Sequence, residues 1–364
     1  MSNKQIMPQP THNNRNSLRV LLKQYLREGG LGENFTWESL TTENGLPHNW
    51  IYDLFQGSDG QIYIGTWGGG LVVINEDNWK IYTKKDGLYS NAITSIQEDQ
   101  QGRVWLATDG GLNLLEDHKI KDGGLGGKSL LNIIIDRKGD LWAGCWRAAL
   151  SGGGLFRFDG GRWQSFSTRQ DLPGQEILKV FEDSEGRIWV GTYEQGMGAG
   201  VGCYDGNRWQ NYREKDGLID DCVYSMFEDP AGNMWFGTVK GLSIFDGKSW
   251  HRLMEQDGLV DNRVYCMLID SNKKFWFGTE KGVSRFDGSE WLSFTKKDGL
   301  VDNLVRTIME TQEGDLWFGT YPYARGKGGI SIAKSDQQKR LVDRVLDLLP
   351  EPPKPGELPS GEGD

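Results

Sequence analysis

Three tryptophans stand outside a pattern that otherwise recurs along the chain. Of the fifteen tryptophans, twelve occupy two repeated positions, whereas Trp50, Trp67 and Trp146 do not. Flat aromatic faces stack on sugar rings or on apolar groups of peptides, and arginine forks and carboxylates fix the orientation of a ligand. The chemistry that these residues indicate is therefore binding.

Further candidates follow the Gly-Thr pair that ends one strand of each repeat unit. The next position is, unit by unit, Trp67, Asp109, Trp146, Tyr193, Val239, Glu280 and Tyr321. Long loops follow in units three, four and seven, and functional sites are often carried by loops on a rigid scaffold. We predict a ligand site formed by Trp50, Trp67, Trp146, Arg147, Tyr193, Glu194, Tyr321, Tyr323 and Arg325. The alternative is that these side chains only pack the loops against one another.

Catalytic signals are weaker. Asp109, Glu194 and Glu280 could supply paired carboxylates, although single acidic residues on a wet rim are usually only solvated. His48 lies beside Trp50, and the other histidines are scattered. No His/Cys/Asp cluster has metal-ligand spacing, no glycine-rich loop is placed to hold a phosphate, and no GxSxG motif is present. We expect that the protein has no cofactor and is not an enzyme.

The elements that would position this site belong to a seven-fold repeat. Its anchoring aromatic falls at Tyr63, Trp105, Trp142, Trp189, Trp235, Trp276 and Trp317. A typical unit predicts four strands, which we call a to d, at residues 223–227, 234–237, 242–245 and 250–253. Units of this size form arrays or propellers, because one unit cannot bury its apolar faces alone.

The two ends of the repeat predict how the ring closes. The seventh unit has an a strand (305–309), a b strand (316–319) and a c strand (330–333), but no d strand follows. One spare d strand, FTWESL at 35–40, precedes unit one. Pairing the two would remove two open sheet edges. We therefore predict an all-β, seven-bladed propeller with four antiparallel strands per blade, whose last blade is completed by the segment around Trp37.

Strand alternation places the b–c and d–a connections on one face of this propeller, and all three unrepeated tryptophans fall in them. Residues that recur in every unit are predicted to be structural, since seven copies of one active site are implausible. The repeated tryptophan is then a packing residue, and the repeated glycines and aspartates shape turns. Asn49, Asn91, Asn262 and Asn303 are expected to brace the d–a loops.

The segments outside the repeat are short. Residues 1–34 contain a predicted amphipathic helix at 17–28, the propeller spans 35–335, and residues 336–364 contain a second predicted helix followed by a Pro/Glu-rich tail. The net charge of −10 argues against nucleic acid as a partner. The four cysteines are expected to be free thiols. We expect a cytoplasmic protein, because neither an apolar leader nor a membrane span is seen.

The repeated residues resemble those of a known family. The pattern Asp-Gly-Leu-x-x-Asn … Asp-x-x-Gly-x-x-Trp-x-Gly-Thr-x-x-Gly-Leu-x-x-Phe-Asp resembles the two-component regulator propeller repeat over about residues 35–335. The resemblance implies a sensor or ligand-binding propeller, often placed before a membrane span and a histidine kinase. Three units depart from the pattern, through Tyr63 in unit one, Lys273 in unit six and a shortened connector at 121–131 in unit three.

These observations favour a non-enzymatic sensor propeller that binds a glycan, a small molecule or a partner peptide. A histidine kinase or another signalling protein on a separate chain is a possible partner. Two alternatives stay open: a propeller hydrolase or lyase acting on an oligosaccharide or a cyclic peptide, and an interaction scaffold that docks through the terminal helices.

Overall fold

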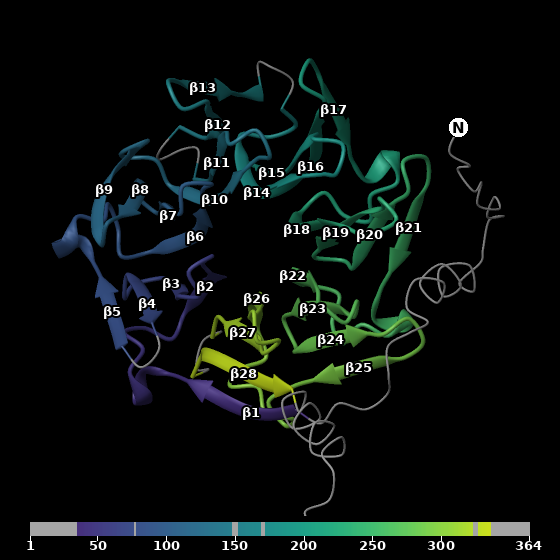
Figure 1. The fold of residues 1–364 in the computed structure, drawn as a ribbon. Coiled ribbons are helices and arrows are strands. Elements are labelled where there is room, and N and C mark those ends of the chain that lie inside the picture. The colour runs from purple at the N-terminus through teal and green to yellow at the C-terminus, as the bar shows by residue number, and fades with distance from the viewer. Residues whose placement is uncertain (1–34, 76–77, 148–151, 169–171, 323–326, 336–364) are drawn as a thin grey trace, which may run out of the picture.

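Seven four-stranded antiparallel sheets surround a central axis in the computed structural model (Figure 1). The structure describes residues 35–75, 78–147, 152–168, 172–322 and 327–335. The predicted helices at both ends, and Tyr323 and Arg325, lie outside these residues. The seven-bladed, four-stranded architecture is confirmed.

Each blade is numbered in chain order, and its a strand lies innermost (Figure 1). The strands of blades 1 to 3 are β2 to β13: Ile51–Gln56, Ile62–Thr66, Leu71–Asn75, Asn78–Tyr82; Ile93–Glu98, Val104–Thr108, Gly111–Glu116, Lys119–Gly124; Leu130–Ile135, Leu141–Cys145, Gly154–Phe158, Trp163–Phe166. The strands of blades 4 to 6 are β14 to β25: Glu176–Glu182, Ile188–Glu194, Met197–Tyr204, Trp209–Tyr212; Val223–Glu228, Met234–Thr238, Leu242–Phe245, Trp250–Leu253; Val264–Ile269, Phe275–Thr279, Val283–Phe286, Trp291–Phe294. Blade 7 consists of β26 to β28 (Val305–Glu310, Leu316–Thr320, Gly329–Ser335) and β1 (Phe35–Leu40).

Strand β1 closes the ring, as predicted. It pairs antiparallel with β28, and Trp37 lies opposite Ala333. A Cβ atom on Gly299 would lie 2.4 Å from Cγ of Trp37. Trp250 and Trp291 approach the equivalent glycines, Gly217 and Gly258, in the same way. The N-terminal strand therefore occupies the position of an ordinary d strand.

Adjacent blades share apolar layers, and the repeated tryptophan contributes to them. Trp189, Trp235 and Trp276 are each 1% exposed, and seven hydrophobic clusters lie between successive blades. In blades 2 to 6, an aspartate of the a–b turn accepts a hydrogen bond from the indole Nε1–H of this residue, as Asp229 does from Trp235 at 2.9 Å. This bond was not foreseen, although the packing role is confirmed.

Short 3-10 helices lead from one blade to the next: η1 (Thr42–Asn44), η2 (Lys84–Asp86), η4 (Glu214–Asp216) and η5 (Glu255–Asp257). The predicted asparagine braces are confirmed. The side-chain oxygens of Asn49, Asn91, Asn262 and Asn303 each accept a hydrogen bond from a backbone N–H seven residues earlier. All four cysteines are free.

Candidate functional site

Five aromatic rings from blades 1, 3 and 7 meet on the face of the b–c and d–a connections, and we call them the aromatic cluster: Trp50, Tyr52, Trp67, Trp146 and Tyr321. Ring centroids lie 4.6 Å apart for Trp50 and Tyr321, 4.7 Å for the stacked pair Tyr52 and Trp67, and 6.4 Å for Trp67 and Trp146. Tyr52 also meets Tyr321 edge-on at 5.8 Å. Four of the predicted site residues are thus brought together.

The sheet ends fix the positions of these rings. Trp67, Trp146 and Tyr321 follow the b strands β3, β11 and β27. Their backbone N–H groups donate to the carbonyl oxygens of Trp50, Ser129 and Leu304, respectively, each at 3.0 Å. Each of these three residues comes directly before the a strand of its blade. One backbone hydrogen bond beyond the end of the sheet therefore joins each b–c connection to the adjoining d–a connection and fixes where its aromatic residue begins.

The aromatic cluster is not part of the structural core. All five residues are half-buried, and none belongs to the seven apolar clusters between blades. Each residue therefore keeps part of its surface accessible, unlike Trp189, Trp235 and Trp276 of the b strands.

Arg147 bridges the cluster to blade 2. Its φ angle of 54° is in the left-handed region, where a residue other than glycine is strained. The guanidinium lies 4.4 Å from the ring centroid of Trp146 and 5.8 Å from that of Trp67. Its Nη1 lies 3.0 Å from Oδ2 of Asp109, and the hydroxyl of Ser129 donates to the same carboxylate. Asp109 is therefore already paired.

Other predicted residues lie apart from this group. Tyr193 and Glu194 end β15, and the expected long loop of blade 4 is instead a β-hairpin with β16. A two-residue turn at Gln195 and Gly196, both with positive φ, extends this hairpin beyond the regular blade. The Tyr193 hydroxyl donates to the carbonyl of Gly196 at 2.6 Å. Within the described residues, neither Tyr193 nor Glu194 has a ring contact or hydrogen bond with the aromatic cluster.

Two of the three carboxylates considered for catalysis, Asp109 and Glu280, have arginine partners, whereas no ion pair of the Glu194 side chain is seen among the described residues. Glu280 pairs with Arg263. His48 packs edge-on against Trp50 at 5.5 Å, and its Nδ1 accepts from the Trp50 N–H. Burial lowers the pKa of His48 and favours the neutral imidazole. Across the described ranges, no group of three or more His, Cys, Asp or Glu side chains is arranged to hold a metal ion.

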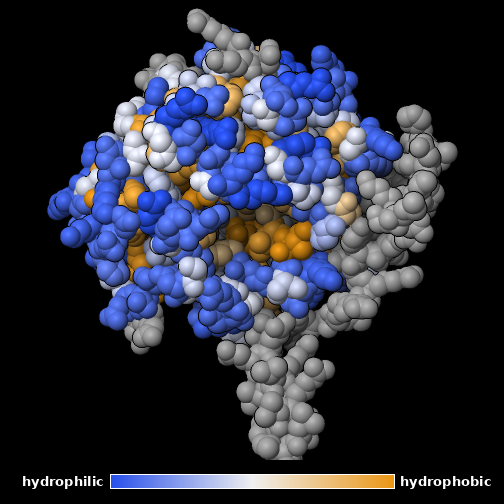
Figure 2. All heavy atoms as spheres, turned by 45° about the horizontal axis from the view of Figure 1, so that its top comes forward, coloured by the Kyte–Doolittle hydropathy of each residue, from blue (hydrophilic) through white to orange (hydrophobic). Residues whose placement is uncertain are grey.

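A cavity of about 220 Å³ lies inside the ring of a strands. In every blade the a strand has a register shift at its second or third residue, which leaves one extra residue at the channel wall. These bulge residues are Tyr52, Thr94, Leu131, Leu178, Tyr224, Tyr265 and Arg306. Figure 2 shows hydrophobic atoms in a hollow near the centre of the disc, surrounded by hydrophilic side chains.

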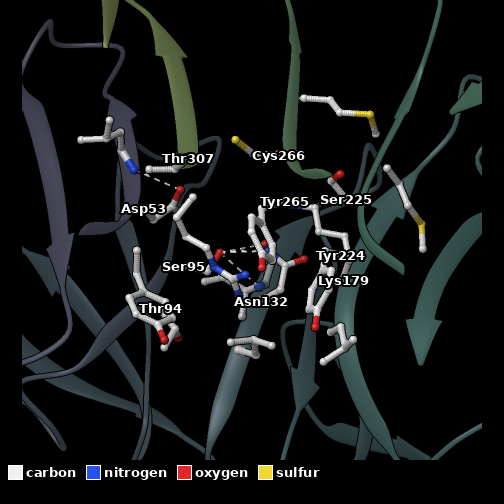
Figure 3. Close-up of a pocket in the computed structure, with 18 of the residues that line it drawn as sticks. Asp53, Thr94, Ser95, Asn132, Lys179, Tyr224, Ser225, Tyr265, Cys266 and Thr307 are labelled. Atoms are coloured by element: carbon white, nitrogen blue, oxygen red, sulfur yellow. Dashed lines mark hydrogen bonds between the residues drawn. The ribbon is translucent and has the colours of Figure 1, made fainter. Parts of the chain in front are cut away.

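One residue further along each strand, polar groups face the same cavity (Figure 3). Asp53 accepts hydrogen bonds from the backbone N–H groups of Ile96 at 2.8 Å and Leu54 at 3.0 Å. Burial raises the pKa of Asp53 to about 6, against the opposing effect of the Lys179 charge. Burial lowers the pKa of Lys179, and the Asp53 carboxylate partly offsets this.

Sequence reasoning missed Tyr52, Tyr224, Tyr265, Arg306, Asp53 and Lys179. A signal was present, because blade-by-blade comparison of the second and third a-strand residues shows the same irregularity that drew attention to Trp67. The inner surface of the a strands lines the channel, so irregular residues there can mark a site in the same way as irregular residues of the b–c connections.

Comparison with protein families confirms the repeat. The two component regulator propeller matches residues 45–68, 90–110, 171–194, 217–240, 258–281 and 299–321. The unmatched unit is blade 3, which has the shortened connector and carries Trp146 and Arg147. No curated protein matches the chain.

Solved structures share the fold at low identity. The extracellular domain of a putative one component system from B. thetaiotaomicron is 20% identical with a TM-score of 0.67, over 82% of this chain and 40% of that one. PorZ, a surface component of the type-IX secretion system of Porphyromonas gingivalis, is 20% identical with a TM-score of 0.62, over 79% and 47%. Virginiamycin B lyase from Staphylococcus aureus is 12% identical with a TM-score of 0.63, over 83% and 99%.

These findings correct one expectation and establish the repeat family. Propellers similar to this one are described as extracellular domains, which contradicts the predicted cytoplasmic location. The sequence of a propeller domain does not by itself indicate the compartment in which the protein works. No helix in the described ranges is long and apolar enough to cross a membrane. The chain is a seven-bladed β-propeller, six blades of which contain the two-component regulator propeller repeat.

Proposed function

We propose that this protein is a non-enzymatic sensor propeller that binds a glycan, a small molecule or a partner peptide at the aromatic cluster. The observation that carries this proposal is that five contacting, half-buried rings lie outside every apolar layer between the blades. Rings that served only to hold the blades together would lie in those layers.

The composition of the cluster fits recognition of a ligand with flat or apolar faces. Trp67 and Trp146 lie nearly edge-to-face, with an interplanar angle of 69°, so they offer two differently directed surfaces. Arg147 and Asp109 add fixed donors and acceptors beside them. Tyrosine, tryptophan and arginine are also the residues that contribute most to protein interfaces.

Catalysis has less support from the geometry. Asp109 and Glu280 are each paired with an arginine, so neither is poised as a free general acid or base. The likeness to virginiamycin B lyase, at 12% identity, concerns the fold. A hydrolase or lyase therefore remains the second candidate. A histidine kinase on a separate chain, and docking through the terminal segments, also remain predictions.

The test compares two tryptophan changes on the same protein. A glycan array and titration calorimetry with a metabolite and peptide panel would identify a ligand for the wild type. The double variant Trp67→Ala/Trp146→Ala should then bind it about tenfold or more weakly. Trp79→Ala is the matched control, because Trp79 is 37% exposed on the outer strand of blade 1. Equal binding by the double variant and the wild type would contradict the proposal.

A further inference from the structure

The wall of the central channel is asymmetric where the bulges place their side chains. Blades 2, 3 and 4 contribute Thr94, Leu131 and Leu178, whereas blades 1, 5 and 6 contribute tyrosines and blade 7 contributes Arg306. The large polar side chains therefore face small and aliphatic ones across the cavity. Such a wall has one side that can anchor a ligand and another that leaves room for it.

The guanidinium of Arg306 is framed by three tyrosine rings. Its central carbon lies 5.6 Å from the ring centroid of Tyr52, 5.6 Å from that of Tyr224 and 5.5 Å from that of Tyr265. Figure 3 shows Tyr224 and Tyr265 at the same cavity as Lys179 and Asp53. Contacts with ring faces stabilise the cation but leave its in-plane N–H donors for other partners.

Carboxylates of the described chain do not neutralise this arginine. No described Asp or Glu lies within ion-pair distance of Arg306, whereas three acids of the same face have other cations: Asp109 has Arg147, Glu280 has Arg263, and Asp261 has Lys281. Three charged residues line the cavity, namely Asp53, Lys179 and Arg306. Asp53 and Lys179 act on each other's charge, whereas no described carboxylate forms an ion pair with Arg306.

The arginine is also continuous with the aromatic cluster. Tyr52 belongs to both groups, since its ring stacks on Trp67 and also faces the Arg306 guanidinium. A ligand lying against Trp67 would therefore reach the channel mouth along Tyr52.

We propose that Arg306 forms an anion subsite at the channel mouth, which takes a carboxylate, sulfate or phosphate group of a ligand whose apolar or ring portion lies against the aromatic cluster. A guanidinium fork binds such groups with two parallel hydrogen bonds. This inference rests on the proposed function. It adds that the channel selects ligands by their negative charge.

Small aromatic acids test the subsite with the full chain. Benzoate and phenyl phosphate carry a ring and an anion, and benzamide is the neutral equivalent of benzoate. Titrations followed by tryptophan fluorescence and calorimetry at low ionic strength should show both anions binding about tenfold or more tightly than benzamide. Equal binding of benzoate and benzamide, or no binding of either anion, would overturn the proposal without any variant.

Variants then locate the anion. Arg306→Met and Arg306→Gln, each checked for folding by circular dichroism, should lose about tenfold or more in benzoate binding. Arg162→Met is the matched control, because the Arg162 side chain is 86% exposed in the turn that precedes the outer strand of blade 3 and faces Asp159. Wild-type affinity in the Arg306 variants, or the same loss in Arg162→Met, would overturn the subsite.

The two proposals can fail separately. A neutral ligand that requires Trp67 and Trp146 but binds equally to Arg306→Met would leave the proposed function standing and remove the anion subsite. Benzoate binding that requires Arg306, together with a ligand screen unaffected by Trp67→Ala/Trp146→Ala, would do the reverse.

Discussion

Blades 5 and 1 have the same four-stranded sheet but differ at both ends. In blade 5, Asp229 accepts bonds from the Trp235 indole and from two turn amides, and the b strand ends in a tight turn that Gly241 closes on Thr238. In blade 1 the equivalent positions are Gly57 and Tyr63, and Trp67 follows the b strand. Strand register and packing between blades are therefore sufficient to form a blade, and the residues of its turns can differ.

Tryptophan lies in two different environments in these two blades. Trp235 is 1% exposed and lies in the apolar layer between blades 5 and 6, whereas Trp67 is half-buried on the rim beside Tyr52. The first ring stabilises the fold, and the second belongs to the proposed binding site.

The largest expected effect is a difference in stability between variants of these two tryptophans. Trp235→Ala should lower the free energy of unfolding by about 3–5 kcal/mol, because it leaves a cavity between two blades and removes the partner of Asp229. Trp67→Ala should lower it by less than about 1 kcal/mol. Urea unfolding of both variants measures the difference, and similar losses would mean that the aromatic cluster is part of the core.

The sequence predicted the parts of the molecule that repeat. Seven in-phase copies identified the blades, and the missing d strand of the last unit identified β1 as the closing strand, because each element had equivalents for comparison. The asparagine braces followed from the same reasoning.

The parts that could not be predicted depend on distances between blades. Trp67 and Trp146 meet across blade 2, so no spacing in the sequence reveals their contact. Arg306 meets Tyr224 and Tyr265 only because three a strands converge on one axis. Glu194 was grouped with the other rim residues by its position in the repeat, and the extended hairpin of blade 4 separates it from the aromatic cluster.

A smaller loss of stability is expected from substitutions that test whether β1 packs against its neighbouring glycine as tightly as the d strand of blade 5 does. Gly299→Ala should cost about 2–4 kcal/mol, because φ is +127° and the new Cβ would overlap Trp37. Gly217→Ala, against Trp250 of blade 5, should cost about the same. Gly247→Ala is the control for backbone strain alone, since φ is +91° and no heavy atom lies within 4 Å of its Cβ.

Thermal and urea unfolding of these three variants separates the two contributions. The Gly247 variant should lose only about 1–2 kcal/mol. A loss at Gly299 no greater than that at Gly247 would show that Trp37 is packed more loosely than the other d-strand tryptophans.

The smallest effect concerns the inner strands, where blade 1 has Asp53 and blade 5 has Ser225. Burial raises the folded-state pKa of Asp53 from 3.8 to about 6, so the folded state holds this proton more tightly than the unfolded state. The resulting stabilisation is complete below about pH 4 and is lost as the pH rises through about 6. About two pKa units set an upper bound of about 3 kcal/mol, and water in the cavity lowers the expected change to about 2 kcal/mol.

Asp53→Asn removes this titration together with the charge that partly offsets the lowered pKa of Lys179, so the comparison measures the effect of the pair. From pH 4 to pH 7, the free energy of unfolding of the wild type should fall by about 2 kcal/mol relative to that of the variant. The constant offset from replacing one carboxylate oxygen, which accepts from the Ile96 or Leu54 amide, cancels in the comparison. Ser225→Ala should follow the wild type at every pH, because Ser225 carries no charge. Parallel curves for the wild type and Asp53→Asn would show that Lys179 and water keep the carboxylate ionised, and that the inner strands of the two blades are electrostatically equivalent.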